Sequence, residues 1–306
     1  MKPVLFSVSY AGLWGQATLS LEDFVIQAKA LGYVGVDLMG KRPHLSPLDW
    51  SASRAAALRR QCEAAGVEVA CVAGYTNFTG GLEAAEVPLV EMQVQYIESL
   101  ARLAQALGCS LVRVFTSYER ADTPLAAQWR LTVEALQQCC DRALDCGVTI
   151  GIQNHHDLAV HSQALRELLL DIDRPNCKLM LDPWSPCLRG EELFNTARDL
   201  APHVVYTTLA DYVRLPRFHY HPGLINYSAT PPDLVRAVPM GEGDLDSLTF
   251  LRGLKAGGYE GPVAYEMCSP LRGGGSRANL DRCARQFLSW FERHTLGGAA
   301  RPPPLE

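Results

Sequence analysis

An apolar segment in the middle of the chain runs abruptly into polar side chains. Residues 148–152 suit a buried strand, and the next five residues are Gln153, Asn154, His155, His156 and Asp157. A strand has no packing reason to end on amides, imidazoles and a carboxylate, because burying such groups without partners is costly. These side chains can bind metal ions, transfer protons or anchor hydroxyl groups. We therefore expect a ligand or a metal ion where this strand reaches the surface.

Two later apolar segments each deliver one carboxylate. Residues 178–181 lead into Asp182, and residues 262–265 lead into Glu266. Both segments have the length and composition of short strands. The sequence thus predicts one site that is assembled from the ends of several strands.

Strand-like segments alternate with helical patterns along the chain, which is typical of successive βα units with parallel strands. We predict eight strands, at residues 4–9, 34–38, 67–73, 111–116, 148–153, 178–182, 203–208 and 262–266. We predict eight helices, at residues 21–31, 46–65, 84–107, 123–146, 161–171, 190–200, 245–257 and 279–295. Glycines at the ends of four of these helices mark where each helix should stop before the next strand.

Eight such units predict an α/β fold of the (β/α)8, or TIM, barrel type, as a single domain over residues 1–296. An open doubly wound sheet would more often have about five to seven strands and a glycine-rich turn after the first strand. The longest interruption, residues 211–243, lacks a helical period, and we predict a loop that acts as a lid or pocket wall. Residues 297–306 are predicted to be a flexible tail.

Composition narrows the class of partner. The net charge of −5 argues against generic nucleic-acid binding, which needs a basic surface. The ten cysteines include no C-x-x-C pair, so we expect reduced, buried thiols. Because no apolar segment approaches the roughly 20 residues of a membrane span, and no signal peptide is evident, we predict a soluble, cytoplasmic protein without membrane partners.

The order of the strand-end motifs resembles the xylose isomerase-like barrel superfamily of sugar phosphate isomerases and epimerases, over about residues 4–295. That superfamily holds a divalent metal, usually Mn, Mg, Co or Zn, with Glu, Asp, His and Glu after strands five to eight. Asp182, in Met-Leu-Asp-Pro-Trp-Ser-Pro, and Glu266, in Ala-Tyr-Glu-Met-Cys-Ser-Pro, match the second and fourth ligands. The resemblance therefore implies a divalent metal bound by Asp182 and Glu266, with Gln153 as a neutral ligand.

Two positions depart from the superfamily pattern. Where it has Glu-Asn-His, this chain has Gln153-Asn154-His155, and where it has His-x-Lys-Asp, this chain has Thr208-Leu-Ala-Asp211. Losing one charge and one nitrogen should weaken metal binding, unless a nearby histidine takes part. The candidates for that role are His155, His156, His219 and His221.

The first departure also affects the expected chemistry. Superfamily epimerases commonly use two glutamates on opposite sides of the substrate, and Gln153 cannot act as a base. A reaction with one base, such as enolisation, dehydration or elimination next to a carbonyl, is therefore favoured over two-base epimerisation. Glu266 is the expected base, with His155 or His156 as its acid partner.

Other residues have a functional and a structural interpretation. His155 shares the strand parity of Gln153 and is expected to face the site, whereas the adjacent His156 should point to the opposite side and bind substrate or a neighbouring loop. Candidate substrate contacts are Asn154, His156, Trp14, Trp184, Arg214 and Arg217. The tryptophans could instead pack beneath loops, and the arginines could be solvated loop charges. The structural alternative for Glu266 is an ion pair with Arg272.

The leading hypothesis is a divalent-metal-dependent sugar or sugar-phosphate isomerase or epimerase that transfers a proton next to a carbonyl. Glu266 and His155 are its expected catalytic residues. A keto-sugar lyase or dehydratase is the alternative reaction, and a non-catalytic sugar-binding barrel with a degenerate metal site is the alternative class. A phosphodiesterase of the endonuclease IV branch is disfavoured by the acidic balance and by only eight histidines. The expected partner is a small carbohydrate, and fold analogy allows a homo-oligomer.

Overall fold

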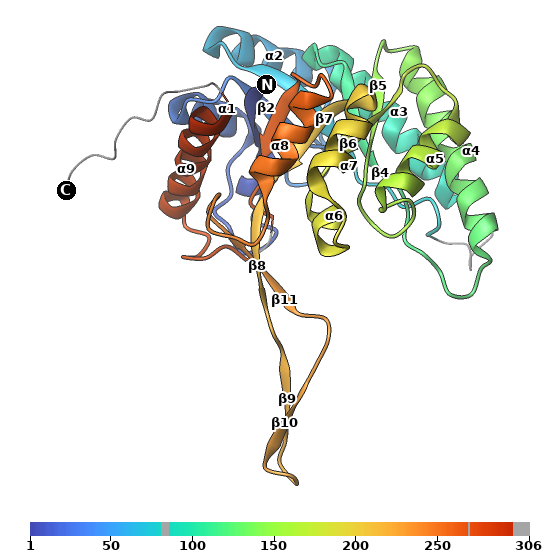
Figure 1. The fold of residues 1–306 in the computed structure, drawn as a ribbon. Coiled ribbons are helices and arrows are strands. Elements are labelled where there is room, and N and C mark those ends of the chain that lie inside the picture. The colour runs from blue at the N-terminus through green and yellow to red at the C-terminus, as the bar shows by residue number, and fades with distance from the viewer. Residues whose placement is uncertain (81–85, 269, 296–306) are drawn as a thin grey trace.

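The computed structural model describes residues 1–80, 86–268 and 270–295, whose strands close into a barrel surrounded by helices (Figure 1). The barrel strands, each parallel to its neighbours, are β1 (Lys2–Phe6), β2 (Gly35–Met39), β3 (Glu68–Ala73), β4 (Leu111–Phe115), β5 (Thr149–Gln153), β6 (Cys177–Leu181), β7 (Val204–Leu209) and β12 (Pro262–Tyr265). Pairing of β12 with β1 closes the ring. The predicted (β/α)8 barrel is therefore confirmed. Both ends of each predicted strand lie within three residues of the ends of an observed strand.

The helices form the outer layer of the barrel. They are α1 (Leu21–Leu31), α2 (Ala52–Ala65), α3 (Leu89–Leu107), α4 (Leu125–Leu144), α5 (Ser162–Ile172), α6 (Trp184–Leu188), α7 (Leu193–Leu200), α8 (Ser247–Ala256) and α9 (Arg277–Thr295). Gly32 and Gly66 end α1 and α2 in the left-handed conformation, with φ of 101° and 65°. The helix predicted at 46–65 begins later, because the hydroxyl of Ser51 caps α2 by accepting from the Arg54 amide. Two 3₁₀ helices, Ser7–Tyr10 and Ala201–His203, complete the barrel wall.

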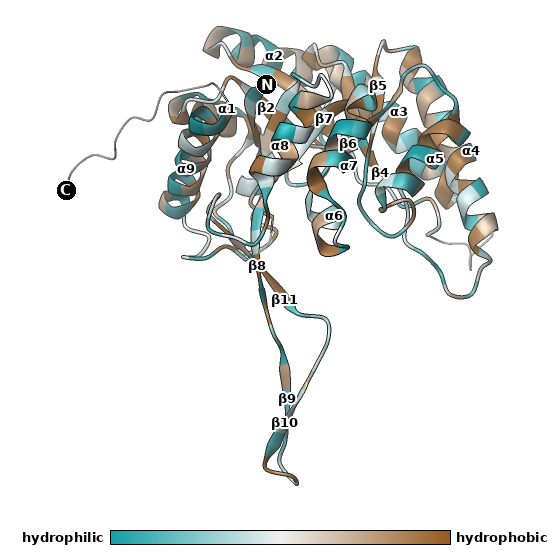
Figure 2. Ribbon diagram, viewed as in Figure 1, coloured by the Kyte–Doolittle hydropathy of each residue, from teal (hydrophilic) through white to brown (hydrophobic). Residues whose placement is uncertain are grey.

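The strands bury apolar side chains both inside the barrel and beneath the helices. In β4, for example, Leu111 and Phe115 are buried on one side of the strand, and Val112 and Val114 are buried on the other. In Figure 2 hydrophobic residues gather on the barrel strands and on the inward sides of the helices, while hydrophilic residues cover the outer surface. The carboxyl ends of the barrel strands therefore emerge together from one apolar core, and polar side chains at these ends share one face of the molecule.

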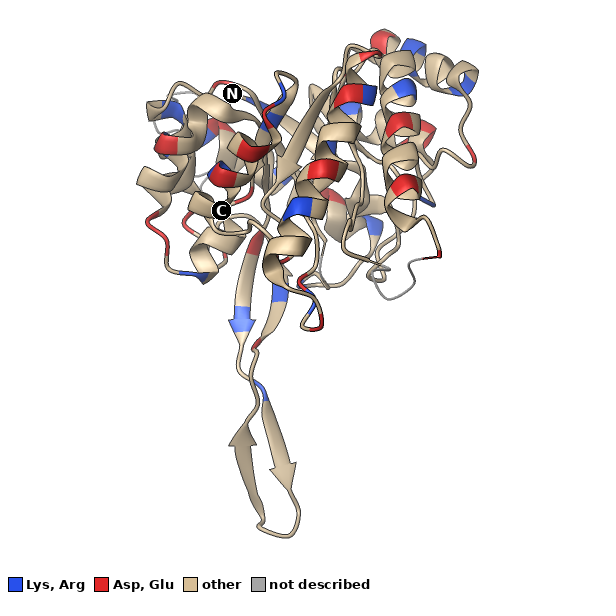
Figure 3. Cartoon of the chain, turned by 90° about the vertical axis from the view of Figure 1, so that its right-hand side faces the viewer, with Lys and Arg blue, Asp and Glu red and all other residues tan. Residues whose placement is uncertain are grey.

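The segment at 211–243 is not the loop that the sequence analysis predicts. It forms an antiparallel ribbon of β8 (Asp211–Leu215), β9 (Phe218–His221), β10 (Asn226–Ala229) and β11 (Leu234–Val238), with β8 paired to β11 and β9 to β10. We call residues 212–236 the arm. Figures 1 and 3 show it extending away from the barrel, so its outer part does not cover the barrel as a lid would.

Three further predictions concern the C-terminal tail, the cysteines and membrane-spanning segments. The tail predicted at 297–306 lies outside the described residues. All ten cysteines lie in the described part of the chain, and all are free thiols. Among the described helices, none combines the length and the apolar composition that crossing a membrane requires.

Candidate functional site

A cavity of about 380 Å³ opens where the strands β5, β6 and β12 end. Six of the site residues predicted from the sequence line it: Asn154, His155, His156, Asp182, Trp184 and Glu266. Ser185 of α6, Tyr212 and Cys268 also belong to its wall. A larger cavity of about 500 Å³ lies among Lys2, Glu68 and Thr149, at the amino-terminal ends of the strands. We place the functional site in the smaller cavity, because barrel enzymes carry their chemistry at the carboxyl ends.

The side chain of Gln153 is held by a buried arginine. Arg113 of β4 donates from Nη1 to Oε1 of Gln153 at 3.0 Å and from Nη2 to the carbonyl of Gly74 at 3.1 Å. Its guanidinium group also lies 4.1 Å from the centre of the Phe115 ring. Since a guanidinium group only donates, the Gln153 atom that faces it must be the oxygen. The amide NH₂ of Gln153 therefore points the other way.

That NH₂ group meets the acidic side of the site. Nε2 of Gln153 donates to the hydroxyl of Thr208 at 3.1 Å and lies 3.5 Å from Oδ2 of Asp182. The hydroxyl of Thr208 donates to the same Asp182 oxygen at 3.0 Å. Gln153 and Thr208 are buried and are absent from the cavity lining, so they orient Asp182 from behind. Nevertheless, burial raises the pKa of Asp182 above its ordinary value.

This donor set does not fit the divalent metal that the resemblance implies. The Gln153 oxygen, which would be the neutral ligand, is occupied by Arg113, and the group turned toward Asp182 is an NH₂ donor that cannot bind a cation. Thr208 offers a hydroxyl where the superfamily has an imidazole. Within the described residues, no group of three or more His, Cys, Asp or Glu is arranged to hold a metal ion. We therefore assign no step to a metal.

Glu266 has the electrostatic setting of a catalytic acid or base. It is 9% exposed at the cavity wall, and burial raises its pKa to about 7. The nearby Asp182 carboxyl group contributes to this rise in pKa, while Arg113 opposes it. The structural alternative for Glu266 is wrong, because Arg272 pairs with Glu242 at 3.4 Å. Glu266 is therefore available to a ligand in the cavity.

His155 and His156 both line the cavity, so the prediction that they point to opposite sides is wrong. Strand β5 ends at Gln153, and His156 has a φ of 70°, so the strand alternation no longer applies. The Tyr118 ring stacks on His156 at 4.0 Å, and the Phe115 ring stacks on His155 at 4.3 Å. These surroundings lower the pKa of both imidazoles, chiefly by desolvation, so both rings are neutral at pH 7.

The tautomer of His155 follows from its hydrogen bonds. The backbone N–H of His156 donates to Nδ1 of His155 at 2.8 Å, so Nδ1 is an acceptor and the proton lies on Nε2. Solvent reaches His155 through the cavity, and Nε2 makes no hydrogen bond with the described protein groups. His155 can therefore donate a hydrogen bond to a ligand from a neutral N–H group. Because its pKa is lowered, it is poorly suited to act as a general acid.

The other predicted contacts lie in different places. Asn154 uses its whole amide to bind the backbone N–H and carbonyl of Asp182, at 2.7 and 2.8 Å, so it positions the ends of β5 and β6. Trp184 lines the cavity against the ring of Tyr212, with centroids 4.7 Å apart. Trp14 is 41% exposed on the loop after β1 and is not part of the cavity lining.

The two predicted arginines are parts of the arm and do not line the cavity. The backbone N–H of Arg214 donates to the Asp244 carboxylate at 3.1 Å, and Arg217 donates to the carbonyl of Pro232 at 3.2 Å. The prediction that they bind substrate assumed a loop folded over the site. The segment is instead a ribbon that projects from the barrel (Figure 1), and neither arginine lines the cavity.

The cationic centre of the barrel was not predicted from the sequence. Arg113 is buried with its guanidinium group near Asp37 of β2, and burial raises the pKa of Asp37 to about 7, against the opposing effect of Arg113. A signal was present, because Leu111-Val-Arg-Val-Phe115 and Gly35-Val-Asp-Leu-Met39 each place one charge inside an otherwise apolar strand. Charges at such positions are rarely buried without a specific partner.

The geometry defines an α/β barrel whose carboxyl-end cavity is lined by three carboxyl groups, of Asp157, Asp182 and Glu266, and by two neutral imidazoles. The chain belongs to the xylose isomerase-like TIM barrel family, whose family model matches residues 25–292. Among curated proteins, no significant match exists.

Solved structures share this fold at low identity. A xylose isomerase domain protein from Alicyclobacillus acidocaldarius is 21% identical, with a TM-score of 0.70 over 97% of this chain and 100% of its own. The probable 3-DHS dehydratase AsbF from Bacillus anthracis is 17% identical, with a TM-score of 0.70 over 94% and 99%. D-Psicose 3-epimerase from Clostridium cellulolyticum H10 is 15% identical, with a TM-score of 0.72 over 96% and 99%. At these identities the similarity establishes the fold alone.

Proposed function

We propose that this chain is an enzyme that transfers a proton at the carbon next to a carbonyl group of a small carbohydrate, with Glu266 as its base. The observation that best supports this proposal is a contrast between two residues of the site. Glu266 is a carboxyl group with a pKa of about 7, whereas Gln153 at the end of β5 is an amide held by Arg113. A base with a pKa near the working pH is well matched to proton transfer.

The cavity residues fit the steps of an enolisation. The Glu266 carboxylate takes the α proton, the C–H electron pair becomes the double bond of an enolate, and negative charge develops on the former carbonyl oxygen. The neutral N–H at Nε2 of His155 is the donor for that oxygen, a role that does not need an imidazolium. Glu266 then holds the proton that must be returned to the substrate or leave with a hydroxyl group.

A single base favours two outcomes over epimerisation. The proton can return to a neighbouring atom on the same side, which is isomerisation, or it can leave with a β-hydroxyl group as water, which is dehydration. Similarity to structures of both an epimerase and a probable dehydratase is compatible with either outcome. A lyase or isomerase with one carboxylate base is therefore our proposal, and a divalent metal of the superfamily type has no part in it.

Solvent exchange tests the proposal before the substrate is known. The chain would be incubated in D₂O with keto-sugars, their phosphates and hydroxylated keto acids, and loss of the α-proton signal would be followed by ¹H NMR. We expect exchange with at least one compound, its loss in Glu266→Gln, and its retention in the control Glu167→Gln, an exposed residue of α5. Exchange that persists undiminished in Glu266→Gln, or ligand binding without any exchange, would overturn the proposal.

A further inference from the structure

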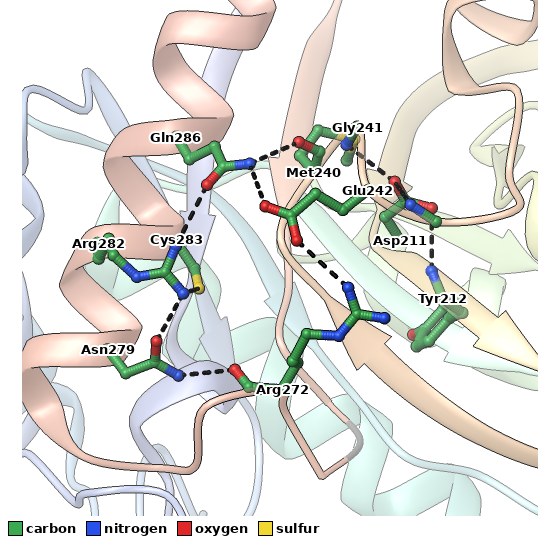
Figure 4. Close-up of polar contacts among 11 residues, drawn as sticks. Asp211, Tyr212, Met240, Gly241, Glu242, Arg272, Asn279, Arg282, Cys283 and Gln286 are labelled. Atoms are coloured by element: carbon green, nitrogen blue, oxygen red, sulfur yellow. Dashed lines mark hydrogen bonds and ion pairs between the residues drawn. The ribbon is translucent and has the colours of Figure 1, made fainter. Parts of the chain in front are cut away.

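The arm is anchored firmly where it leaves the barrel (Figure 4). Oδ2 of Asp211 accepts from the backbone N–H groups of Gly241 and Gly243, at 2.8 and 2.9 Å, which joins the two ends of the ribbon. From α9, Gln286 donates to the carbonyl of Met240 and to the Glu242 carboxylate, each at 3.1 Å. The root is therefore fixed to the barrel wall, and the arm is held out in a defined direction.

The outer arm has one apolar and one polar face. The register of β9 and β10 pairs Tyr220 with Tyr227 and Phe218 with Ala229, so these side chains share one face. The rings of Tyr220 and Tyr227 lie 4.9 Å apart. The opposite face holds two more cross-strand pairs, His221 with Asn226 and His219 with Ser228.

Nothing in the described part of the chain covers the apolar face. Phe218 and Tyr227 are each 64% exposed and Tyr220 is 44% exposed, while Leu224 and Ile225 at the turn are 75% and 82% exposed. A two-stranded ribbon is at best marginally stable by itself in water, so a projecting ribbon with aromatic side chains on one face requires a covering surface.

The charge of the arm and its position on the barrel indicate which surface covers it. The arm carries three arginines and one aspartate, whereas the chain as a whole carries −5, which leaves −7 on the rest. The arm starts at the carboxyl end of β7, on the face where the site opens. Two loops and the short helix α6 on the same face expose further large apolar side chains: Leu13, Trp14, Tyr118 and Leu188. The same face thus carries the basic arm, which is partly apolar, and these four exposed apolar residues, which we call the rim. The rest of the barrel is acidic.

We infer that the arm docks on a second copy of this chain. A twofold axis between two carboxyl-end faces lets each arm pack its apolar face against the rim of the other barrel, which satisfies both surfaces with one self-complementary interface. Opposite net charges of arm and barrel favour this pairing. Because Tyr118 of the rim also lines the cavity, the interface lies next to the candidate site.

Sedimentation velocity of the full chain over a range of concentrations tests the inference. We expect the wild type to sediment as a dimer and the double variant Tyr220→Thr with Tyr227→Thr to dissociate at least about tenfold more readily. The matched control on the polar face, His219→Thr with Ser228→Thr, should sediment as the wild type does. Unchanged thermal unfolding of the barrel would show that both variants fold.

A second variant removes the outer arm. Residues 216–233 would be replaced by Asn-Gly, a dipeptide suited to a tight hairpin between Leu215 and Leu234, which are paired in β8 and β11. We expect a folded monomer. A monomeric wild type would overturn the inference and assign the arm to a different protein, and a dimer that survives both variants would place the interface elsewhere.

Discussion

Gln153 at the end of β5 and Glu266 after β12 differ by a single terminal atom, but their surroundings are opposite. Gln153 is buried behind Asp182, where its oxygen accepts from Arg113 and its NH₂ group faces acceptors. Glu266 reaches the cavity, and burial, together with the nearby Asp182, raises its pKa. On the β5 side, a buried cation therefore holds a neutral amide, whereas on the β12 side a carboxyl group with a pKa of about 7 faces the cavity.

The largest effect is expected on the β12 side. Replacement of Glu266 by Gln keeps the shape of the side chain but removes the base, so turnover of an identified substrate should fall by about 10²–10⁴-fold, the usual contribution of a general base. Steady-state kinetics would measure the loss in kcat. An unchanged kcat in this variant would show that Glu266 is not the base and that its difference from Gln153 has no part in catalysis.

The next effect is expected when the charge on the β5 side is removed. Arg113→Met leaves Asp37 without its neighbouring cation and the Gln153 oxygen without its donor, so the free energy of unfolding should fall by about 3–5 kcal/mol. Urea denaturation would measure it. Arg130→Met is the control, because Arg130 is an exposed residue 3.9 Å from Glu134, and it should change stability by less than about 0.5 kcal/mol. Equal effects of the two variants would contradict a structural role for Arg113.

Substitutions can also give the β5 side an acidic side chain like that of the β12 side. The double variant Gln153→Glu with Thr208→His restores the superfamily ligand types, so its affinity for Mn²⁺ should exceed that of the wild type by at least about tenfold, or about 1.4 kcal/mol. Isothermal titration calorimetry would measure binding, and addition of Asp182→Ala should abolish the gain. Equal affinity of wild type and double variant would show that Gln153 and Thr208 do not weaken the site.

A further effect is expected on stability as a function of pH. The folded-state pKa of Glu266, about 7, exceeds its ordinary value of 4.5, so ionisation of Glu266 makes the folded state less stable as pH rises between these values. Glu266→Gln removes this loss. Its free energy of unfolding, relative to the wild type, should rise between pH 4.5 and 7 by on the order of 2 kcal/mol and then level off. A constant difference across that range would show an ordinary Glu266 pKa.

Much of the barrel could be predicted from the sequence because its signals are local. Apolar segments, helical periods and the glycines that end helices all act over a few residues, and the predicted strands match the observed ones. Asp182 and Glu266 were found in the same way, as single carboxylates directly after strands.

The features that the sequence analysis missed depend on contacts between distant residues or on a different local period. Arg113 and Gln153 are 40 positions apart, so no spacing rule links them. In the arm, aromatic residues and histidines alternate along β9 with the period of a strand, whereas the loop prediction rested on the absence of a helical period. The positive φ of His156 has no marker in the side-chain types around it.

The most direct test of the account is elemental analysis of the wild-type chain, purified without chelator or nickel and then dialysed against Mn²⁺, with Asp182→Ala as its control. Because Arg113 occupies the Gln153 oxygen and Thr208 replaces an imidazole, we predict no stoichiometric metal in either sample. About one metal ion per chain in the wild type, lost in Asp182→Ala, would contradict the account and restore a metal to the centre of the mechanism.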